Sequence, residues 1–493
     1  MKLTDIIFAL ALPLLLLCSC GNDEGQTPIK RFNIESIVRY TQHEQNLKIE
    51  FTMESSGVEV SVKNSAEWID NLNVVSTAKG KCLTAHIAEN IGSERTATLT
   101  LSAPGYAAAT IKVKQNGVPA TPANHTLMFY FFGTSLNRYF STNIEDAKLA
   151  IESGALGENN RVVFFRQSSK TEGYIGELCL DKESGKCFEC IIESDIPIDS
   201  SIITADFISA NINRLSSLAP AERYGLVLAG HGTAWIPRET AGVSKAGVSS
   251  PLFVPADGAE VTRHFGESNV QVNPSEIAEG IANSDIELDY ILFDACFMSN
   301  IETIYELRNS ANYIIASPCE IMGRGFPYER TLPFLFKDNG NYTDYDGAAK
   351  SYYLYYRDEY TSSSRCGSIA VYDCTEVEAL RDATKEVVKS AREEYDVESL
   401  QTYEGQPHHY FYDFGEWVNV VATDSAALAA FSAQLDKTVV AKYTLNSYYT
   451  AYGSYGTRPI NVNVYSGVTT SAPSATLNTI WRGTEWYKSI WEL

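Results

Sequence analysis

Cysteine is scarce in this sequence, and so are positive charges and long apolar runs. The 493 residues include 10 cysteines, too few for a scaffold held together by disulfides. Asp and Glu outnumber Lys and Arg by 61 to 39, for a net charge of −22. A field of that sign repels phosphate backbones, so we expect no nucleic-acid partner. The apolar content of 44% excludes wholesale disorder, and the length predicts two to four domains.

The longest apolar run lies at the N-terminus and indicates a targeting segment. Residues 6–17 follow Lys2 and are fewer than the roughly 20 residues that a membrane-spanning helix needs. The run ends in Leu-Cys-Ser-Cys, which resembles a bacterial lipobox and implies cleavage before Cys20 and lipidation of its thiol. An ordinary secretory peptide is the alternative. The acidic residues after Cys20 resemble a surface-export signal, so we expect an outer-membrane lipoprotein exposed at the cell surface, with the lipid as its only membrane contact.

Residues 36–117 consist of short segments that alternate apolar and polar side chains. Period two is typical of half-buried strands, and their regular spacing predicts a small β-sandwich. Trp68, residues 95–99 and the closing residues 113–117 resemble a BACON domain, an immunoglobulin-like module. That resemblance implies glycan contact. Because the stretch has no cluster of exposed aromatic residues, we favour a spacer.

After a linker at residues 118–124 the pattern changes. Apolar runs are now continuous, as in strands buried on both faces of a parallel sheet. Segments with helical spacing lie between them, so we predict an α/β fold with a mostly parallel sheet. The predicted strands are 127–132, 162–165, 224–229, 290–293, 313–316 and 368–372, and the predicted helices are 198–218, 274–282, 300–308 and 376–392.

Two of these strands end in reactive side chains. The strand at 224–229 is followed by His231 between two glycines, and the strand at 290–293 by Asp294 and Cys296. Ligands of α/β proteins bind beyond the carboxyl ends of such strands. A helix beginning near Ser299 and Asn300, soon after Cys296, would lower the pKa of its thiol and offer N–H groups to an oxyanion. Each residue alone is more often structural, but together they predict a nucleophile and base pair.

These motifs resemble the clostripain family of cysteine peptidases, whose fold is caspase-like. The matching residues are His231-Gly232 with Trp235, Asp294-Ala295-Cys296 with Met298, and the segments 316–317, 323–328 and 412–415. The chain is thus divided into a signal peptide (1–19), a tether (20–35), a BACON-like sandwich (36–117), a linker (118–124) and a clostripain-like domain (125–493).

The resemblance also implies roles for individual residues. Cys296 attacks the scissile carbonyl, His231 protonates the leaving amine, and the N–H groups of Gly232 and Cys296 form the oxyanion hole. Asp294 matches the acid at the base of the P1 pocket, which favours Arg or Lys. The strand that reaches Ser317 lines the groove. Substrates are then proteins or peptides, and the chemistry needs no cofactor or metal. No pattern supports a calcium requirement, which stays open.

Basic residues bear on two further properties, the P1 specificity and the maturation of the chain. The family commonly has an acidic residue where this chain has Arg324, whose charge would weaken attraction for a basic P1 side chain or pair with Asp294. Many relatives are cut in the loop after the catalytic His. Here Lys245 is the preferred site and Arg238 the second, with an unprocessed surface loop as the alternative.

Other motifs give weaker indications of a redox or metal site. Cys187 and Cys190 have redox or zinc-like spacing, but a local disulfide or free thiols fit better. His408 and His409 are interpreted as surface residues rather than metal ligands. The alternative functions are a non-catalytic surface binding lipoprotein that retains the fold and a redox lipoprotein using the Cys187–Cys190 pair.

Overall fold

The structure is a computed structural model. It describes residues 30–55, 57–119, 122–198, 203–232, 234–237, 272–406, 408–452 and 459–492. The predicted signal peptide, Cys20, Arg238 and Lys245 lie outside these ranges.

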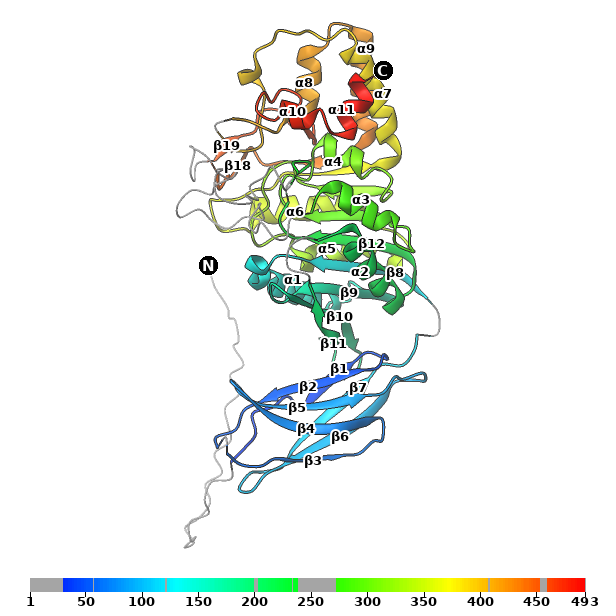
Figure 1. The fold of residues 1–493 in the computed structure, drawn as a ribbon, viewed down its shortest axis with the longest axis vertical. Coiled ribbons are helices and arrows are strands. Elements are labelled where there is room, and N and C mark those ends of the chain that lie inside the picture. The colour runs from blue at the N-terminus through cyan, green and yellow to red at the C-terminus, as the bar shows by residue number, and fades with distance from the viewer. Residues whose placement is uncertain are drawn as a thin grey trace, which may run out of the picture.

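Seven strands between residues 37 and 115 form an N-terminal β-sandwich (Figure 1). One sheet has the order β1-β7-β6-β3 and the other β2-β5-β4. In β2, Leu47, Ile49 and Phe51 are buried and the residues between them are exposed, as the alternating pattern predicts. The strands are β1 (Ile37–Tyr40), β2 (Gln45–Phe51), β3 (Ser61–Asn64), β4 (Ile69–Thr77), β5 (Gly80–Ile87), β6 (Arg95–Ser102) and β7 (Ala109–Gln115).

The second domain is built on a nine-stranded sheet with the order β11-β10-β9-β8-β12-β13-β14-β15-β17. The five strands from β9 to β14 are mutually parallel, and two antiparallel strands extend the sheet at each edge. The mostly parallel α/β prediction is confirmed. The strands are β8 (Ala123–Phe131), β9 (Asn160–Gln167), β10 (Glu172–Asp181), β11 (Lys186–Pro197), β12 (Ala221–Ala229), β13 (Tyr290–Asp294), β14 (Tyr313–Ala316), β15 (Ile369–Asp373) and β17 (Val439–Tyr443).

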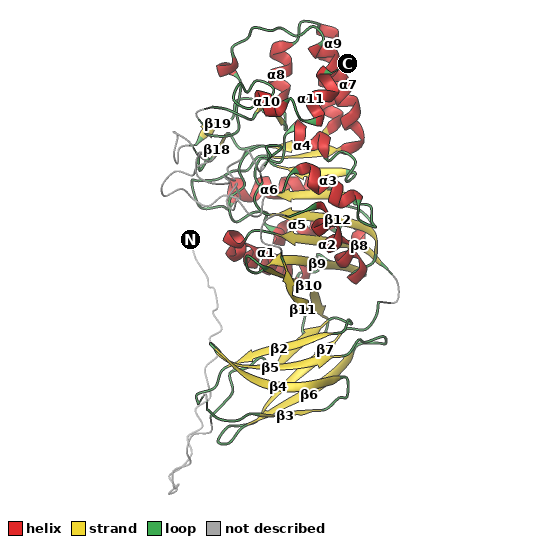
Figure 2. Cartoon of the chain, in the orientation of Figure 1, coloured by secondary structure: helices red, strands yellow, loops and turns green. Residues whose placement is uncertain are grey.

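Helices cover both faces of this sheet (Figure 2). Helices α1, α5 and α6 pack together on one face, and α2, α3, α4 and α7 form the other layer. Helix α2 begins at Ala205, where Thr204 caps it, rather than at the predicted residue 198. The helices are α1 (Asn137–Glu152), α2 (Ala205–Leu218), α3 (Pro274–Ala282), α4 (Ile301–Glu306), α5 (Tyr328–Leu335), α6 (Tyr345–Asp358), α7 (Val377–Val388), α8 (Phe414–Val421), α9 (Ser425–Thr438), α10 (Asn478–Trp481) and α11 (Glu485–Trp491).

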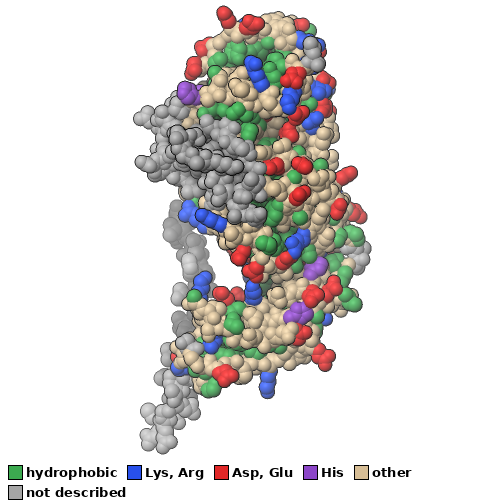
Figure 3. Space-filling view, viewed as in Figure 1, with side chains coloured by type: hydrophobic (Ala, Val, Ile, Leu, Met, Phe, Trp, Pro, Cys, Tyr) green, Lys and Arg blue, Asp and Glu red, His purple; other side chains and the backbone are tan. Residues whose placement is uncertain are grey.

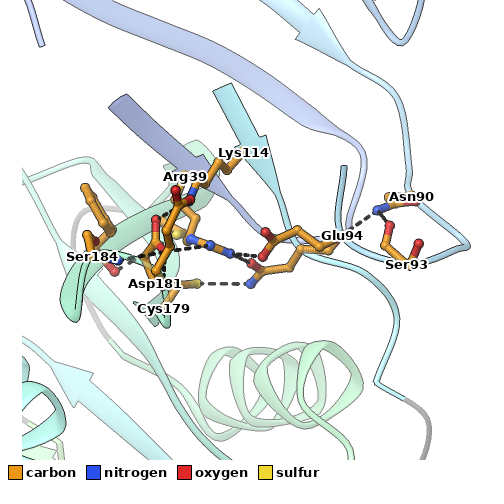
Figure 4. A network of polar contacts seen from close by, with 12 residues as sticks. Arg39, Asn90, Ser93, Glu94, Lys114, Cys179, Asp181 and Ser184 are labelled. Carbon is orange, nitrogen blue, oxygen red and sulfur yellow. Dashed lines mark hydrogen bonds and ion pairs between the residues drawn. The ribbon is translucent and has the colours of Figure 1, made fainter. Parts of the chain in front are cut away.

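The sandwich packs against the β10–β11 edge of the large sheet through a buried charge network (Figure 4). Arg39 and Lys114 are cross-strand neighbours on β1 and β7. Both face Asp181 at the end of β10, with N–O distances of 3.4 Å from Arg39 and 2.8 Å from Lys114. The Asp181 side chain is 1% exposed and both cations are 4% exposed. The domain predicted as a spacer is therefore docked on its neighbour.

Charges elsewhere are dispersed. On the face shown in Figure 3, Lys and Arg side chains are interspersed with Asp and Glu over both domains. Among the described residues, no helix is both long enough and apolar enough to cross a membrane.

Candidate active site

The parallel pairing of β12 with β13 places His231 and Cys296 side by side. Ala229 lies opposite Asp294 in the register, and each reactive residue follows two positions later. Beyond the paired residues, the Gly230 N–H still donates to the Asp294 carbonyl at 3.3 Å. The carboxyl ends of neighbouring parallel strands thus bring the predicted base and nucleophile to one edge of the sheet.

Gly232 is in direct backbone contact with Cys296. A Cβ atom at position 232 would lie 2.1 Å from the Cys296 carbonyl oxygen and 2.9 Å from its nitrogen. Only glycine fits such an approach, because any side chain would overlap backbone atoms that cannot move aside. The two backbone segments that are predicted to supply the oxyanion hole therefore meet.

The chain turns sharply after Cys296. Phe297 has φ of +60°, a left-handed conformation that is uncommon for a bulky residue. Its N–H donates to the Cys319 carbonyl at 3.0 Å, and its ring stacks on Phe411 with centroids 5.2 Å apart. The turn is therefore held from two sides, and the Cys296 thiol is oriented by it. Cys296 itself is fully buried.

The helix predicted at 300–308 is present, as α4 with Asn300 at its N-cap. Helix α4 begins at Ile301, five residues beyond the thiol, and a helix dipole acts mainly within its first turn. The Ile321 N–H, in the loop after β14, donates a hydrogen bond to the Cys296 sulfur at 3.0 Å. The loop after β14 therefore contacts the thiol directly, whereas α4 begins five residues after it.

Ser135 is a hydrogen-bond partner of the His231 imidazole that the sequence did not predict. The Ser135 hydroxyl, in the turn before α1, lies 2.9 Å from His231 Nε2. Gly133 allows this approach, because a Cβ there would lie 3.2 Å from the ring. The two residues are 96 positions apart in sequence, and no motif surrounds Ser135, so only the fold brings them together.

Asp294 and Ser317 are both fully buried, and their side chains hold loops of the site in place. Asp294 Oδ2 accepts hydrogen bonds from the Phe326 N–H at 3.2 Å and the Tyr328 hydroxyl at 2.8 Å. The Ser317 hydroxyl donates to the Cys319 carbonyl at 3.2 Å. Asp294 thus anchors the start of α5.

Arg324 forms its ion pair with Asp146 of α1, at 2.5 Å, instead of with Asp294 as one prediction had it. The guanidinium also lies 5.9 Å from the centre of the Tyr355 ring. Burial raises the pKa of Asp146, and the nearby Arg324 charge opposes that shift. The charge that was expected to disturb a basic P1 side chain is therefore matched by a carboxylate on a neighbouring helix.

The remaining cysteine and histidine candidates have structural surroundings. Cys187 and Cys190 lie buried on β11 as free thiols, and burial raises the pKa of both. His409 Nδ1 lies 2.9 Å from the buried Glu404 carboxylate. Within the described ranges, no group of three or more His, Cys, Asp or Glu side chains is arranged to hold a metal ion.

Comparisons with known proteins agree with this geometry. The sequence profile described as the clostripain family matches residues 130–475. A secreted C11 cysteine protease from Bacteroides thetaiotaomicron, "iotapain", is 28% identical with a TM-score of 0.65, over 75% of this chain and 99% of that one. An inactive zymogen C11 protease from Parabacteroides distasonis is 28% identical with a TM-score of 0.62, over 76% and 100%. No curated protein sequence matches.

Proposed function

The chain belongs to the clostripain family of cysteine peptidases, and from that premise we propose that it is a lipid-anchored surface endopeptidase with a Cys296–His231 dyad. The contact between Gly232 and the Cys296 backbone carries this proposal. It supports a common site for the nucleophile, the base and two oxyanion donors, which catalysis of acyl transfer requires.

The mechanism follows from the placement of these groups. The Cys296 thiolate attacks the scissile carbonyl carbon, and the new C–S bond leaves negative charge on the carbonyl oxygen. The N–H groups of Gly232 and Cys296 stabilise that oxyanion. His231 then donates its proton to the leaving amine as the C–N bond breaks. In the second half, His231 takes a proton from water, and the resulting hydroxide cleaves the thioester.

Substitution of the nucleophile tests the reaction. We expect Cys296→Ala to abolish peptide cleavage and labelling by thiol-directed peptide inhibitors, with the circular dichroism spectrum unchanged. His231→Ala should cost nearly as much, because members of a catalytic unit are not additive. Cys374→Ala is the matched control, since Cys374 is also a buried thiol. It follows the C-terminal end of β15, which runs antiparallel to β14, so it lies at the other edge of the sheet from Cys296. Wild-type protein that folds and cleaves nothing would favour the non-catalytic binding protein instead.

We further propose a preference for Arg or Lys at P1, conferred by Asp294. Its support is the position of this carboxylate at the end of β13, where it accepts hydrogen bonds from the Phe326 N–H and the Tyr328 hydroxyl. Peptides that differ only at P1 test it. Cleavage of Arg, Lys, Leu and Asp substrates at equal rates would contradict the preference and leave the peptidase activity in place.

Anchoring is proposed to occur through acylated Cys20, with the BACON-like sandwich as a spacer between anchor and enzyme. Mass spectrometry of the mature N-terminus tests this: a diacylglyceryl-modified Cys20 is expected, and Cys20→Ser should move the protein out of the membrane fraction. An unmodified N-terminus elsewhere would contradict it.

Maturation by cleavage after Lys245 is also proposed. N-terminal sequencing of purified wild type should find a fragment that begins at Ala246, and Cys296→Ala should lack it if the cut is autocatalytic. A fully active, uncut chain would contradict any requirement for processing.

A further inference from the structure

A small apolar cavity adjoins the catalytic pair on the side away from Asp294. It has a volume of about 60 Å³, and the segments on either side of the dyad line it, Gly230–Gly232 after β12 and Ala295 with Met298 after β13. Among its described lining residues there is no Asp, Glu, Lys or Arg. A side chain bound here would therefore be close to the reacting bond and surrounded mainly by hydrocarbon.

The deeper wall of the cavity is formed by the sheet and two helices. Tyr130, Leu228 and Phe293 stand in one cross-strand row of β8, β12 and β13. Ile208 of α2 and Ile277 of α3 face this row from the helical layer. Ile208 and Ile277 are 3% and 7% exposed, so packed elements of the fold fix the size of the cavity.

The cavity and the Asp294 carboxylate lie on opposite faces of the sheet. Phe293 and Asp294 are consecutive in β13, so their side chains point in opposite directions. Phe293 lines the cavity, whereas Asp294 accepts the Tyr328 hydroxyl at the start of α5. Successive side chains of an extended substrate alternate in the same way. If P1 points to the Asp294 side, the next residue along the substrate points to the cavity.

The position of His231 indicates which neighbour of the P1 residue places its side chain in the cavity. His231 lines the cavity and, in the proposed mechanism, protonates the leaving amine, which is the nitrogen of P1′. We propose that this cavity is the S1′ subsite, which binds the P1′ side chain, and that it takes a small aliphatic side chain such as that of Ala or Val. The inference rests on the proposed peptidase function and adds a substrate class to it.

Size and polarity set the expected selectivity. A volume of about 60 Å³ is small, and it suits a short aliphatic side chain of one to three carbon atoms better than an aromatic ring. Each methylene group in an apolar pocket changes kcat/KM by about 10- to 200-fold, and an unpaired charge there is costly. Substrates with Ala or Val at P1′ should therefore be cleaved at least about 30-fold faster than those with Asp, Lys or Trp.

The experiment measures kcat/KM of the full-length protein on peptides that differ only at P1′, with P1 held at Arg in one series and at Leu in another. A second set varies P2 with P1′ held at Ala. Selectivity for Ala and Val at P1′ supports the subsite. Equal rates across P1′, or a size preference found at P2 alone, overturn it while the peptidase activity stands. Cleavage of no peptide at all overturns the proposed function and this inference together.

A variant pair tests the lining itself. Ile277→Ala enlarges the cavity and should raise the rate on Leu at P1′ relative to Ala by roughly tenfold. Ile281→Ala is the matched control, because Ile281 is also a buried residue of α3 but does not line the cavity. Equal changes in both variants would overturn the assignment. If Ile277→Ala fails to fold, the milder Ile208→Val should show a smaller shift in the same direction.

Discussion

The domain interface and the strand ends that carry His231 and Cys296 are assembled in opposite ways. At the interface, one buried carboxylate, Asp181, joins two cations of the sandwich. At the strand ends, the register of β12 with β13 places His231 and Cys296, and backbone N–H groups and hydroxyls orient them. The domain interface depends on matched charges in a few side chains. The strand ends depend on a ladder of backbone hydrogen bonds.

This difference predicts how each region responds to substitution. Removal of one partner from a buried ion pair leaves the other charge desolvated, which is strongly destabilising. Loss of one side chain at the strand ends leaves the ladder intact, so the chemistry changes and the stability hardly does. Interface variants should thus alter unfolding, and site variants should alter rate constants.

The largest effect is expected from Asp181→Ala, which removes the carboxylate between Arg39 and Lys114. We expect the free energy of unfolding to fall by roughly 2–4 kcal/mol, at the lower end of values for broken buried pairs because the interface lies close to solvent. Urea unfolding followed by circular dichroism measures it, and peptidase activity of the folded fraction should be unchanged.

Glu183 provides the control for this variant. Its carboxylate also contacts Lys114, at 2.5 Å, but its side chain is 71% exposed. Glu183→Ala should therefore have little effect on unfolding. If the two variants were equally stable, the interface would depend on its apolar contacts and not on its charges.

A pH titration sharpens the same point. Burial alone would raise the pKa of Asp181, but the hydrogen bond from Lys114, the Glu183 N–H and the Arg39 charge lower it to about 2. The unfolded chain, with an ordinary Asp pKa near 3.8, then binds more protons between these values. The stabilisation by Asp181 is thus complete above about pH 4 and is lost as pH falls toward 2. The stability difference between wild type and Asp181→Asn should shrink over that window, and a constant difference would contradict it.

These two regions were also unequally predictable from sequence. The continuous run at 313–316 predicted β14 residue for residue, because a strand buried on both faces is apolar throughout. The β10–β11 hairpin was missed, since Glu177, Asp181 and Glu189 interrupt its apolar pattern. Glu177 pairs with Arg161 within the sheet and Asp181 with the sandwich. The charged residues at such positions pair with residues that are distant in sequence, so no local sequence pattern predicts that a strand runs through them.

Within the site, too, contacts between residues distant in sequence could not be predicted from local patterns. His231 and Cys296 could be predicted because each follows its own strand, and parallel strands end at one edge. Ser135 could not, because it approaches His231 only through the turn between β8 and α1. The start of α4 was also predicted to within one residue, but the left-handed turn at Phe297 that precedes it was not.

Ser135→Ala should have an intermediate effect, on rate and not on stability. Loss of a hydrogen bond of about 1 kcal/mol to the His231 ring should lower kcat by about fivefold, with KM nearly constant. Ser135→Thr, which retains the hydroxyl, should recover part of the rate. An unchanged kcat in Ser135→Ala would mean that the hydroxyl does not orient the imidazole, whereas an unfolding shift without a kcat change would assign it a purely structural role.

The smallest effect is expected from Arg324→Ala on P1 preference. The sequence suggested that this guanidinium opposes a basic P1 side chain, but its charge is paired with Asp146 at 2.5 Å. A paired charge has little net field at the distance of a neighbouring pocket, because the Asp146 carboxylate cancels most of it. The ratio of Arg to Leu cleavage at P1 should therefore change by less than about twofold. Asp146→Asn is the informative partner variant: it leaves the Arg324 charge without its carboxylate, and the Arg-to-Leu ratio should then fall. A large rise in that ratio in Arg324→Ala itself would show that the guanidinium acts on the P1 side chain despite its pairing.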